Sequence, residues 1–417
     1  MKKKILIVGN SARGYALAKK LAENNDVFVA PASDTLKEFA TCLDIRENSI
    51  QELLEFVLEN GIDMTIPVSE EAIKADISAI FAQHNQPVFG PISRAGKLCY
   101  DKTFTKKTLY KLRVPTPKFG IFEKDSMAFD YIKNQRLPFV VKTNSPNSAV
   151  VLSSEQMGKN IISSYLAEKN SKVIIEDYVY GTSFSFYTIT DGYKALPIGS
   201  SLIYKHSLEG DGGQITGGMG ACVPNYKLTI EDEYFLMDNV IYPILEYCDG
   251  NGSPYLGILG INGIITPEGE IEVLGCSSFM QDCDTASILD LAEDDLYGLF
   301  ESCIIGSFSD EIENIHLKDK YSVSIVLTCS DKENKENVIN GTENLNDNTH
   351  ITYYPSVNKN KYLEYEAVNG SVMVLSCSAQ TASKASDYVY SEAGEIVFKG
   401  IRYRKDIVRQ PKELVLV

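Results

Sequence analysis

Three charged side chains stand where apolar runs of the chain end. Lys142 closes "PFVVKT", and Glu176 and Asp177 close the apolar part of "VIIEDYV" some 34 residues further on. Lys102 lies upstream in "YDKTFTK". A nucleotide site needs ammonium groups for the phosphates and an extended backbone beside the adenine ring. This order of residues indicates a nucleotide site, although a Lys among valines is also compatible with an exposed strand edge.

A second candidate site is the glycine-rich run "GDGGQITGGMGACVP", residues 210–224, which has six glycines in fifteen residues. Glycine adopts positive φ at little cost and lets other atoms approach the backbone closely. The run is compatible with a flexible surface loop or with a backbone that wraps around a small anionic ligand. Composition alone leaves both alternatives open.

Short apolar strands alternate with helical spacings from residue 4 to about residue 95. This alternation predicts parallel βαβ units and a doubly wound sheet over residues 1–100. Ligands of such sheets bind at the carboxyl ends of the strands, so Gly9–Arg13 and Val68–Glu71 are candidate ligand loops. The loop "VGNSARGYAL" lacks the glycines of a dinucleotide fingerprint, which disfavours a dehydrogenase.

Two further units follow this sheet. A basic amphipathic helix in "YDKTFTKKTLYKLRVPTPKFG" opens a β-rich, mixed α/β unit that we expect over residues 101–318. The last unit, residues 319–417, has strand patterns and one helix in "TASKASDYVYSEAGEI". Its polar tract, residues 331–350, is expected to form an exposed loop or a weakly ordered hairpin.

The composition excludes several classes of protein. A net charge of −16 with no basic region argues against a nucleic-acid binder. No stretch approaches the roughly 18 apolar residues of a membrane span, and the opening "MKKKILIVGN" is interpreted as a first strand rather than a leader. Nine cysteines without a CxxC pair favour free thiols in a reducing cytoplasm, and the scattered histidines offer no zinc spacing.

With these motifs in place, the chain resembles the phosphoribosylamine–glycine ligases (glycinamide ribonucleotide synthetases) of the ATP-grasp superfamily. The resemblance follows the chain in order through "IVGNSARGYAL", "VFVAP", "FGP", "DKTFTK", "VVKT", "IIEDYV" and "RKDI". Its most specific part is Thr-Gly-Gly-Met-Gly-Ala at residues 216–221.

The resemblance implies a multidomain α/β and α+β fold. Its parts are a Rossmann-like pre-ATP-grasp domain (1–100), an ATP-grasp domain (101–318) with a lid subdomain at about 118–190, and a mixed C-terminal domain (319–417). It also implies a ligase that phosphorylates glycine with ATP and then joins it to 5-phosphoribosylamine in purine synthesis. The implied partners are these small molecules, and the implied assembly is a monomer or homodimer in the cytoplasm.

The family's site residues transfer onto matching positions of this sequence. The resemblance implies that Lys102, Lys142, Glu176, Asp177 and Val179 bind ATP, with Glu176 accepting from the adenine amino group. The ribosyl phosphate is assigned to Gly9, Asn10, Ser11 and Arg13. The glycine and phosphoribosylamine end is assigned to Asp211, Gly213, Thr216, Gly217, Gly218, Met219 and Gly220. Lys142 and Asp211 are the expected catalytic residues.

The sequence departs from the family where ATP and metal are handled. The family binds Mg²⁺ or Mn²⁺ through a Glu and an Asn, which are Gly275 and Ser277 here, and Phe279 replaces its Arg. Asp282 remains a weak candidate metal ligand, and alternation along a strand places Glu272 on the opposite face from Gly275. The lid segment "TNSPNSAVVL" lacks the family's glycines, and "GTS" replaces Gly-Glu-Glu.

These departures leave two hypotheses besides the disfavoured dehydrogenase. The first is an active ligase that recruits metal through Asp282, Asp284 or the substrate phosphates. The second is a catalytically impaired or non-catalytic relative that binds a phosphoribosyl or nucleotide ligand.

Overall fold

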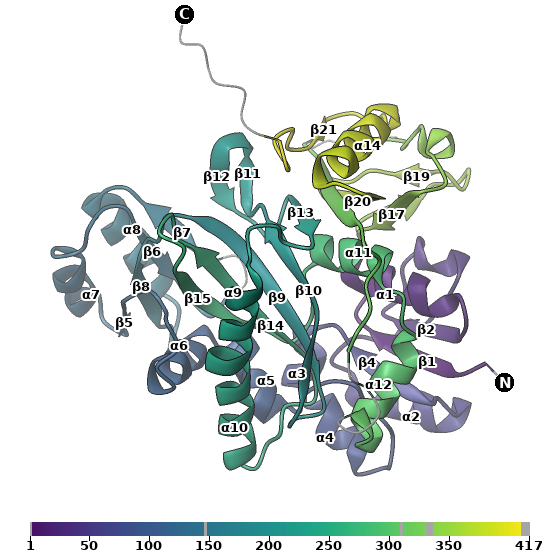
Figure 1. Ribbon diagram of the computed structural model, residues 1–417, viewed down its shortest axis with the longest axis horizontal. Helices are drawn as coiled ribbons and strands as arrows, with labels where there is room; N and C mark the ends of the chain where they lie inside the picture. Colours follow the sequence, from purple (N-terminus) through teal and green to yellow (C-terminus); the bar gives the residue numbers. More distant parts are fainter. Residues whose placement is uncertain (1, 146–147, 309–311, 313, 331–336, 410–417) are drawn as a thin grey trace, which may run out of the picture.

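We describe the fold from a computed structural model, which covers residues 2–145, 148–308, 312, 314–330 and 337–409. Figure 1 shows the N-terminal unit and a small lid-like sheet at opposite sides of the molecule. Long strands lie between these two parts, and the C-terminal unit stands above the N-terminal unit. No helix in the described ranges is long and apolar enough to cross a membrane.

The N-terminal unit is a parallel sheet in the order β3-β2-β1-β4, which confirms the predicted α/β class. Its strands are β1 Lys4–Val8, β2 Asp26–Ala30, β3 Thr41–Cys42 and β4 Met64–Pro67, and its helices are α1 Ala12–Ala22, α2 Ile50–Asn60, α3 Glu70–Lys74 and α4 Ile77–Ala82. Helices α3 and α4 are separate, because Asp76 adopts a left-handed conformation with φ 61° between them. After α4 the chain returns to this sheet through an isolated parallel bridge between Val88 and Thr65.

A separate antiparallel sheet forms the lid-like part. Its order is β5-β8-β6-β7, with β5 Phe119–Phe122, β6 Phe139–Lys142, β7 Val150–Leu152 and β8 Val173–Asp177. Helices α7 Asp125–Ile132 and α8 Glu155–Leu166 pack against this sheet around a core of its own, which includes Phe139, Val141 and Ile175. The carboxyl ends of β6 and β8 carry Lys142 and Glu176–Asp177, as the sequence predicts.

One large sheet links the middle of the chain to its C-terminal part. Its order is β15-β14-β9-β10-β13-β16-β20-β17, and β21 pairs with β16. The strands are β9 Thr182–Thr190, β10 Ala195–Ile203, β13 Gly220–Val223, β14 Gly257–Ile265, β15 Ile271–Ser277, β16 Tyr321–Cys329, β17 Thr349–Tyr353, β20 Gly370–Ala379 and β21 Ile401–Arg402. Short β13 pairs with both β10 and β16, so the expected units 101–318 and 319–417 share a sheet. The domain limits themselves stay a prediction.

The remaining elements connect and cover these sheets. They are η1 Leu36–Glu38, α5 Ser93–Tyr100, α6 Lys102–Lys111, β11 His206–Leu208, η2 Glu209–Asp211, β12 Gly212–Ile215, α9 Ile230–Leu236, the π-helical η3 Met237–Ile241, α10 Tyr242–Gly250, α11 Asp282–Leu291, α12 Leu296–Ile305, η4 Thr342–Asn344, β18 Asn358–Lys359, β19 Tyr365–Glu366 and α14 Ala382–Glu395. In the polar tract 331–350, residues 331–336 lie outside the described residues. The described remainder holds η4 and the start of β17.

Candidate functional site

A cavity of about 860 Å³ opens where the three sheets meet. Its wall comes from the carboxyl ends of β1 and β4, the start of α6, the small sheet and the hinge that follows β8. The opposite wall comes from the β10–β12 segment and from β14, β15 and the start of α11. Both predicted ligand loops of the N-terminal sheet contribute, through Ser11 and Arg13 and through Val68–Glu71.

The cavity gathers most of the site residues that the sequence predicts. The lining residues among them are Ser11, Arg13, Lys102, Lys142, Glu176, Asp177, Val179, Asp211, Thr216, Gly217, Gly275, Ser277 and Asp282. Gly9, Asn10, Gly213, Gly218, Met219 and Gly220 are not lining residues. Direct substrate contact by these six residues stays a prediction.

Lys142 and Glu176 form a buried ion-pair cluster with a third residue, Lys106. Lys142 Nζ lies 2.6 Å from Glu176 Oε1, and Lys106 Nζ lies 2.9 Å from Glu176 Oε2. Burial opposes the charge of Glu176, but the two ammonium groups outweigh it and hold the pKa of this carboxyl below its usual value. Burial lowers the pKa of Lys106 to about 8. The predicted amphipathic helix α6 therefore turns one of its lysines into the protein interior.

Lys102 reaches the cavity from the first turn of α6. Asp101 caps this helix by accepting a hydrogen bond from Phe104 N at 3.0 Å. The Lys102 ammonium donates to Ser145 O at 2.7 Å and to Ser148 Oγ at 3.2 Å. Burial, and then the neighbouring charge of Lys142, lower the pKa of Lys102 to about 8. Two ammonium groups thus share one region of the cavity, as binding of an anionic ligand requires.

The loop after β1 presents Arg13 to the cavity. Its Nε donates to Val68 O at 2.9 Å, which ties α1 to the loop after β4. Its Nη1 lies 3.3 Å from Asp282 Oδ1, and the guanidinium lies over the Phe279 ring at 3.8 Å from the ring centre. The backbone N–H of Arg13 also donates to Asp282 Oδ1 at 3.1 Å. Asp282 is the one carboxylate that this chain retains from the family's metal-binding segment, and here it is paired with Arg13.

The other metal positions of the family lie on β15 beside the cavity. Gly275 faces Asn262 of β14 in the register, and the space around its missing side chain is open. Ser277 lies opposite Gly260, and its Oγ has no hydrogen-bond partner. Within the described residues, no group of three or more His, Cys, Asp or Glu side chains is suited to hold a metal ion.

Two further carboxylates near this region do not line the cavity. The register between β14 and β15 shifts between Asn262 and Gly263, which interrupts the alternation of side chains along β15. Counting residues from Gly275 therefore does not decide on which face of the sheet Glu272 lies. Glu272 is nevertheless absent from the cavity wall. Asp284, which the ligase hypothesis offers as another metal ligand, is fully buried and accepts a hydrogen bond from Tyr187 Oη at 2.5 Å. Burial raises the pKa of Asp284 to about 6.

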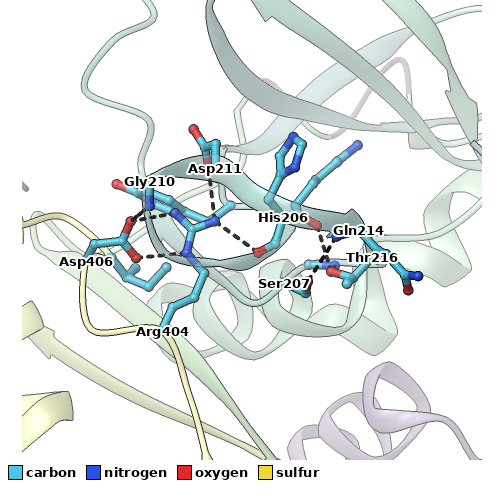
Figure 2. A network of polar contacts seen from close by, with 12 residues as sticks. His206, Ser207, Gly210, Asp211, Gln214, Thr216, Arg404 and Asp406 are labelled. Carbon is cyan, nitrogen blue, oxygen red and sulfur yellow. Dashed lines mark hydrogen bonds and ion pairs between the residues drawn. The ribbon is translucent and has the colours of Figure 1, made fainter. Parts of the chain in front are cut away.

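The glycine-rich run supplies the turn and second strand of the hairpin β11–η2–β12 (Figure 2) and then enters β13. Thr216 Oγ1 donates to Lys205 O at 2.8 Å and accepts from Gly218 N at 3.1 Å. Gly213 needs its glycine, because φ is +77° and a Cβ would lie 2.4 Å from Ser207 Oγ. Gly220 is required by packing, since a Cβ would lie 2.5 Å from Ser324 O of β16. The run is therefore structured, and its residues that line the cavity are Asp211, Ile215, Thr216 and Gly217.

Figure 2 also shows that the C-terminal segment holds this hairpin. The buried Arg404 lies 3.0 Å from Asp211 Oδ1 and donates to His206 O at 3.0 Å. Asp406 accepts two bonds from the Arg404 guanidinium, at 2.8 and 2.7 Å, and one from Gly210 N at 2.9 Å. Asp211, a predicted catalytic residue, therefore lines the cavity with one carboxylate oxygen already paired.

Sequence reasoning did not identify Lys205, Asn262 or Arg404. Lys205 follows the apolar strand β10 much as Lys142 ends β6, so the pattern of a lysine after an apolar strand could have identified it. Asn262 lies within an otherwise apolar strand, and a single amide side chain in a strand does not by itself indicate a functional site. Arg404 belongs to "RKDI", whose resemblance to the family did not indicate a contact with the glycine-rich run.

Comparison with known proteins agrees with this fold. Two family models match, phosphoribosylglycinamide synthetase, N domain, over residues 3–98, and phosphoribosylglycinamide synthetase, ATP-grasp (A) domain, over residues 100–285. Phosphoribosylamine–glycine ligases of Fusobacterium nucleatum and Vibrio parahaemolyticus are each 28% identical to this chain. The alignments cover 97% of this chain and 98% and 97% of those relatives.

Solved structures show the same architecture. The phosphoribosylamine–glycine ligase of Thermotoga maritima superimposes with a TM-score of 0.80 at 20% identity, covering 97% of this chain and 100% of that one. A biotin carboxylase of Campylobacter jejuni, in a β,γ-ATP complex, gives 0.71 at 14% identity, covering 96% and 93%. The chain therefore belongs to the phosphoribosylglycinamide synthetase family and has the ATP-grasp fold of its ligases.

Proposed function

We propose that the protein is an ATP-dependent ligase that joins glycine to 5-phosphoribosylamine. In the first step, a glycine carboxylate oxygen takes the γ-phosphoryl group of ATP, giving glycyl phosphate and ADP. In the second step, the amine nitrogen attacks the carbonyl carbon, the C–N bond forms, and inorganic phosphate leaves as the nitrogen loses a proton. The products are glycinamide ribonucleotide, ADP and phosphate.

The observation that carries this proposal is the composition of the cavity wall. Lys102 and Lys142 line the same cavity as Thr216–Gly217 of the glycine-rich run and Arg13 of the N-terminal loop. Phosphoryl transfer depends mainly on positioning and on positive charge near the transferring group. We assign the ATP phosphates to the two lysines, the ribosyl phosphate to Ser11 and Arg13, and the glycine end to the loop that contains Asp211 and Thr216.

For adenine we propose recognition by the hinge after β8. The Asp177–Val179 backbone lines the cavity, and extended backbone offers both a donor and an acceptor to the ring edge. Glu176 remains our candidate for the adenine amino group, and in the described structure its carboxylate joins Lys142 and Lys106. Lys142, a lining residue of the cavity, is thereby held by Glu176.

We propose that the family's metal site is degenerate in this chain. Mg²⁺ prefers hard oxygen donors, usually one or two carboxylates together with phosphates. Gly275 offers no donor, Ser277 offers an uncharged hydroxyl, and Asp282 is paired with Arg13. The residues at these positions do not fit a divalent cation, and neither of the two proposed steps depends on one.

We further propose a cytoplasmic protein that is a monomer or homodimer. All nine cysteines are free thiols, which supports a reducing compartment.

The test of the ligase is ADP release by purified protein. We expect release from ATP to require both glycine and freshly generated phosphoribosylamine, with glycinamide ribonucleotide as the other product. Lys142→Met should abolish it, whereas Lys107→Met, on the exposed face of α6, should leave it unchanged. If folded protein releases no ADP under these conditions while glycinamide ribonucleotide still raises its Tm, the ligase proposal is wrong and the non-catalytic alternative is favoured.

A further inference from the structure

Most charged groups in the cavity wall already have a partner within the protein. Glu47 accepts a hydrogen bond from Ser69, Glu70 and Glu71 pair with Lys74, and Glu176, Asp211 and Asp282 pair with lysine or arginine. Among the cations, Arg13 is held by Asp282, Lys142 by Glu176, and Lys102 by two oxygens of the lid segment. A ligand that enters this cavity meets few uncommitted charges.

Lys205 is held less tightly than these cations. It follows β10, is half-buried and lines the cavity. Its ammonium donates to Asn262 Oδ1 over 3.4 Å, a long hydrogen bond, and the buried Asp284 carboxylate attracts it electrostatically. Burial, and to a lesser extent the nearby charge of Lys142, lower the pKa of Lys205, and the Asp284 carboxylate opposes this shift. The ammonium group therefore retains most of its capacity to donate to an incoming anion.

The position of Lys205 coincides with the region where the family places its metal. Asn262, which accepts from Lys205, is the direct partner of Gly275 in the β14–β15 register. Direct cross-strand partners place their Cβ atoms about 5 Å apart on one face of the sheet. A glutamate at position 275 would thus place its carboxylate near the Lys205 ammonium. Because this chain has glycine at position 275, that space is open.

We propose that the Lys205 ammonium takes the place of a divalent cation in this cavity, so that adenine nucleotides bind through protein cations without metal. The inference rests on the proposed function, because it takes the phosphates of ATP and ADP as the ligand. An ammonium group supplies a compact positive charge with three donors, which suits phosphate oxygens. Asn262, which also lines the cavity, holds the ammonium by a hydrogen bond, and the buried Asp284 attracts it from behind the cavity wall.

The test compares ADP binding by isothermal titration calorimetry with excess EDTA and with Mg²⁺. We expect the two dissociation constants to agree within about twofold. Lys205→Met should weaken ADP binding about 10- to 100-fold in EDTA, because a charge-assisted contact is lost. Lys205→Arg, which keeps the charge, should retain most of the affinity, and Lys107→Met should match the unmodified protein. A Tm measurement shows that each variant is folded.

A second set of variants tests whether the Lys205 ammonium supplies the positive charge that a bound metal would otherwise supply. Gly275→Glu alone should remain independent of Mg²⁺, because the new carboxylate pairs with Lys205. Gly275→Glu combined with Lys205→Met should bind ADP at least about tenfold more tightly with Mg²⁺ than with EDTA.

The outcomes separate this inference from the ligase proposal. ADP binding that requires Mg²⁺ in the unmodified protein, or that is unchanged in Lys205→Met, overturns the role of Lys205 and leaves the ligase proposal standing. Mg²⁺ dependence in Gly275→Glu with Lys205 intact also overturns it. Absence of ADP binding with and without Mg²⁺ overturns both proposals.

Discussion

Lys102 carries a charge that is lost just above neutral pH. Burial and the nearby Lys142 lower its pKa to about 8, from the value near 10.5 of a free lysine. The charged form therefore dominates below pH 8 and disappears above it. A polyphosphate ligand stabilises the charged form, so it binds best where Lys102 is already protonated.

From this we predict how nucleotide affinity depends on pH. The affinity for ADP should fall by about tenfold between about pH 7 and about pH 9, since the charged fraction of Lys102 falls by that factor. Lys102→Gln should bind more weakly at pH 7 and show a flatter profile. Calorimetric titration of both proteins over this range checks the prediction, and parallel profiles for the two proteins would contradict it.

Glu176 is the residue on which the two buried lysines depend for compensation. Its side chain is 4% exposed and that of Lys106 is 1% exposed. Removing one partner of a buried ion pair leaves uncompensated charge, which costs about 3–5 kcal/mol.

We therefore predict that Glu176→Gln lowers the free energy of unfolding by about 3 kcal/mol. Urea denaturation followed by circular dichroism measures this change. The matched control is Glu123→Gln, whose pair with Lys172 is exposed and whose loss should leave the free energy of unfolding nearly unchanged. Equal effects of the two substitutions would show that the Glu176 cluster is not a stabilising element.

At the scale of elements, the hairpin β11–η2–β12 has few contacts of its own and depends on a distant segment. Gly210 and Asp211 are bound by Asp406 and Arg404, and Lys405 N donates to Glu209 Oε1 at 3.2 Å. Arg404 is 2% exposed, and Asp406 holds it through two hydrogen bonds. Burial opposes the charge of Asp406, but Arg404 outweighs it and keeps the pKa of this carboxyl below its usual value. The C-terminal segment thus sets the position of the glycine-rich run.

Replacing Arg404 should loosen this hairpin. We predict that Arg404→Met destabilises the protein by about 3 kcal/mol, because Asp406 is left without its cation. Hydrogen exchange should increase in residues 206–216 more than elsewhere. Arg409→Met removes an exposed pair with Asp387 and should cost less than about 1 kcal/mol. Unchanged exchange in the hairpin would contradict the proposed anchoring.

At the scale of the whole molecule, the large sheet makes the C-terminal part inseparable from the middle of the chain. β16 pairs with β13 on one side and with β20 on the other. One apolar cluster includes Ile7 of β1, Tyr187 of β9 and Val323 of β16. The N-terminal, middle and C-terminal units therefore share a core.

A fragment of residues 1–318 should fail to fold cooperatively. It would expose the edge of β13 and the apolar residues that β16 and β20 cover, which favours aggregation. We expect the full chain to unfold in urea with one transition by fluorescence and circular dichroism, and the fragment to lack a sharp transition. A cooperative transition in the soluble fragment would show that the C-terminal part is an independent domain.

Local pattern was sufficient for several features of this protein. Alternating strands and helices predicted the parallel N-terminal sheet and the two loops that line the cavity at its carboxyl end, since apolar period and turn residues are local properties. Lysines and acids at strand ends predicted side chains that line one cavity, and the family resemblance agreed with the matches to known proteins.

Only the tertiary structure decided which of these groups are free to act. Sequence spacing does not reveal that Glu176 joins Lys106 to Lys142, that Arg13 engages Asp282, or that Arg404 holds Asp211. These pairs join residues far apart in the chain, and their partners are selected by burial and by the cost of an unpaired charge. The same physics leaves Lys205 beside the open space at Gly275, where the family carries a metal ligand.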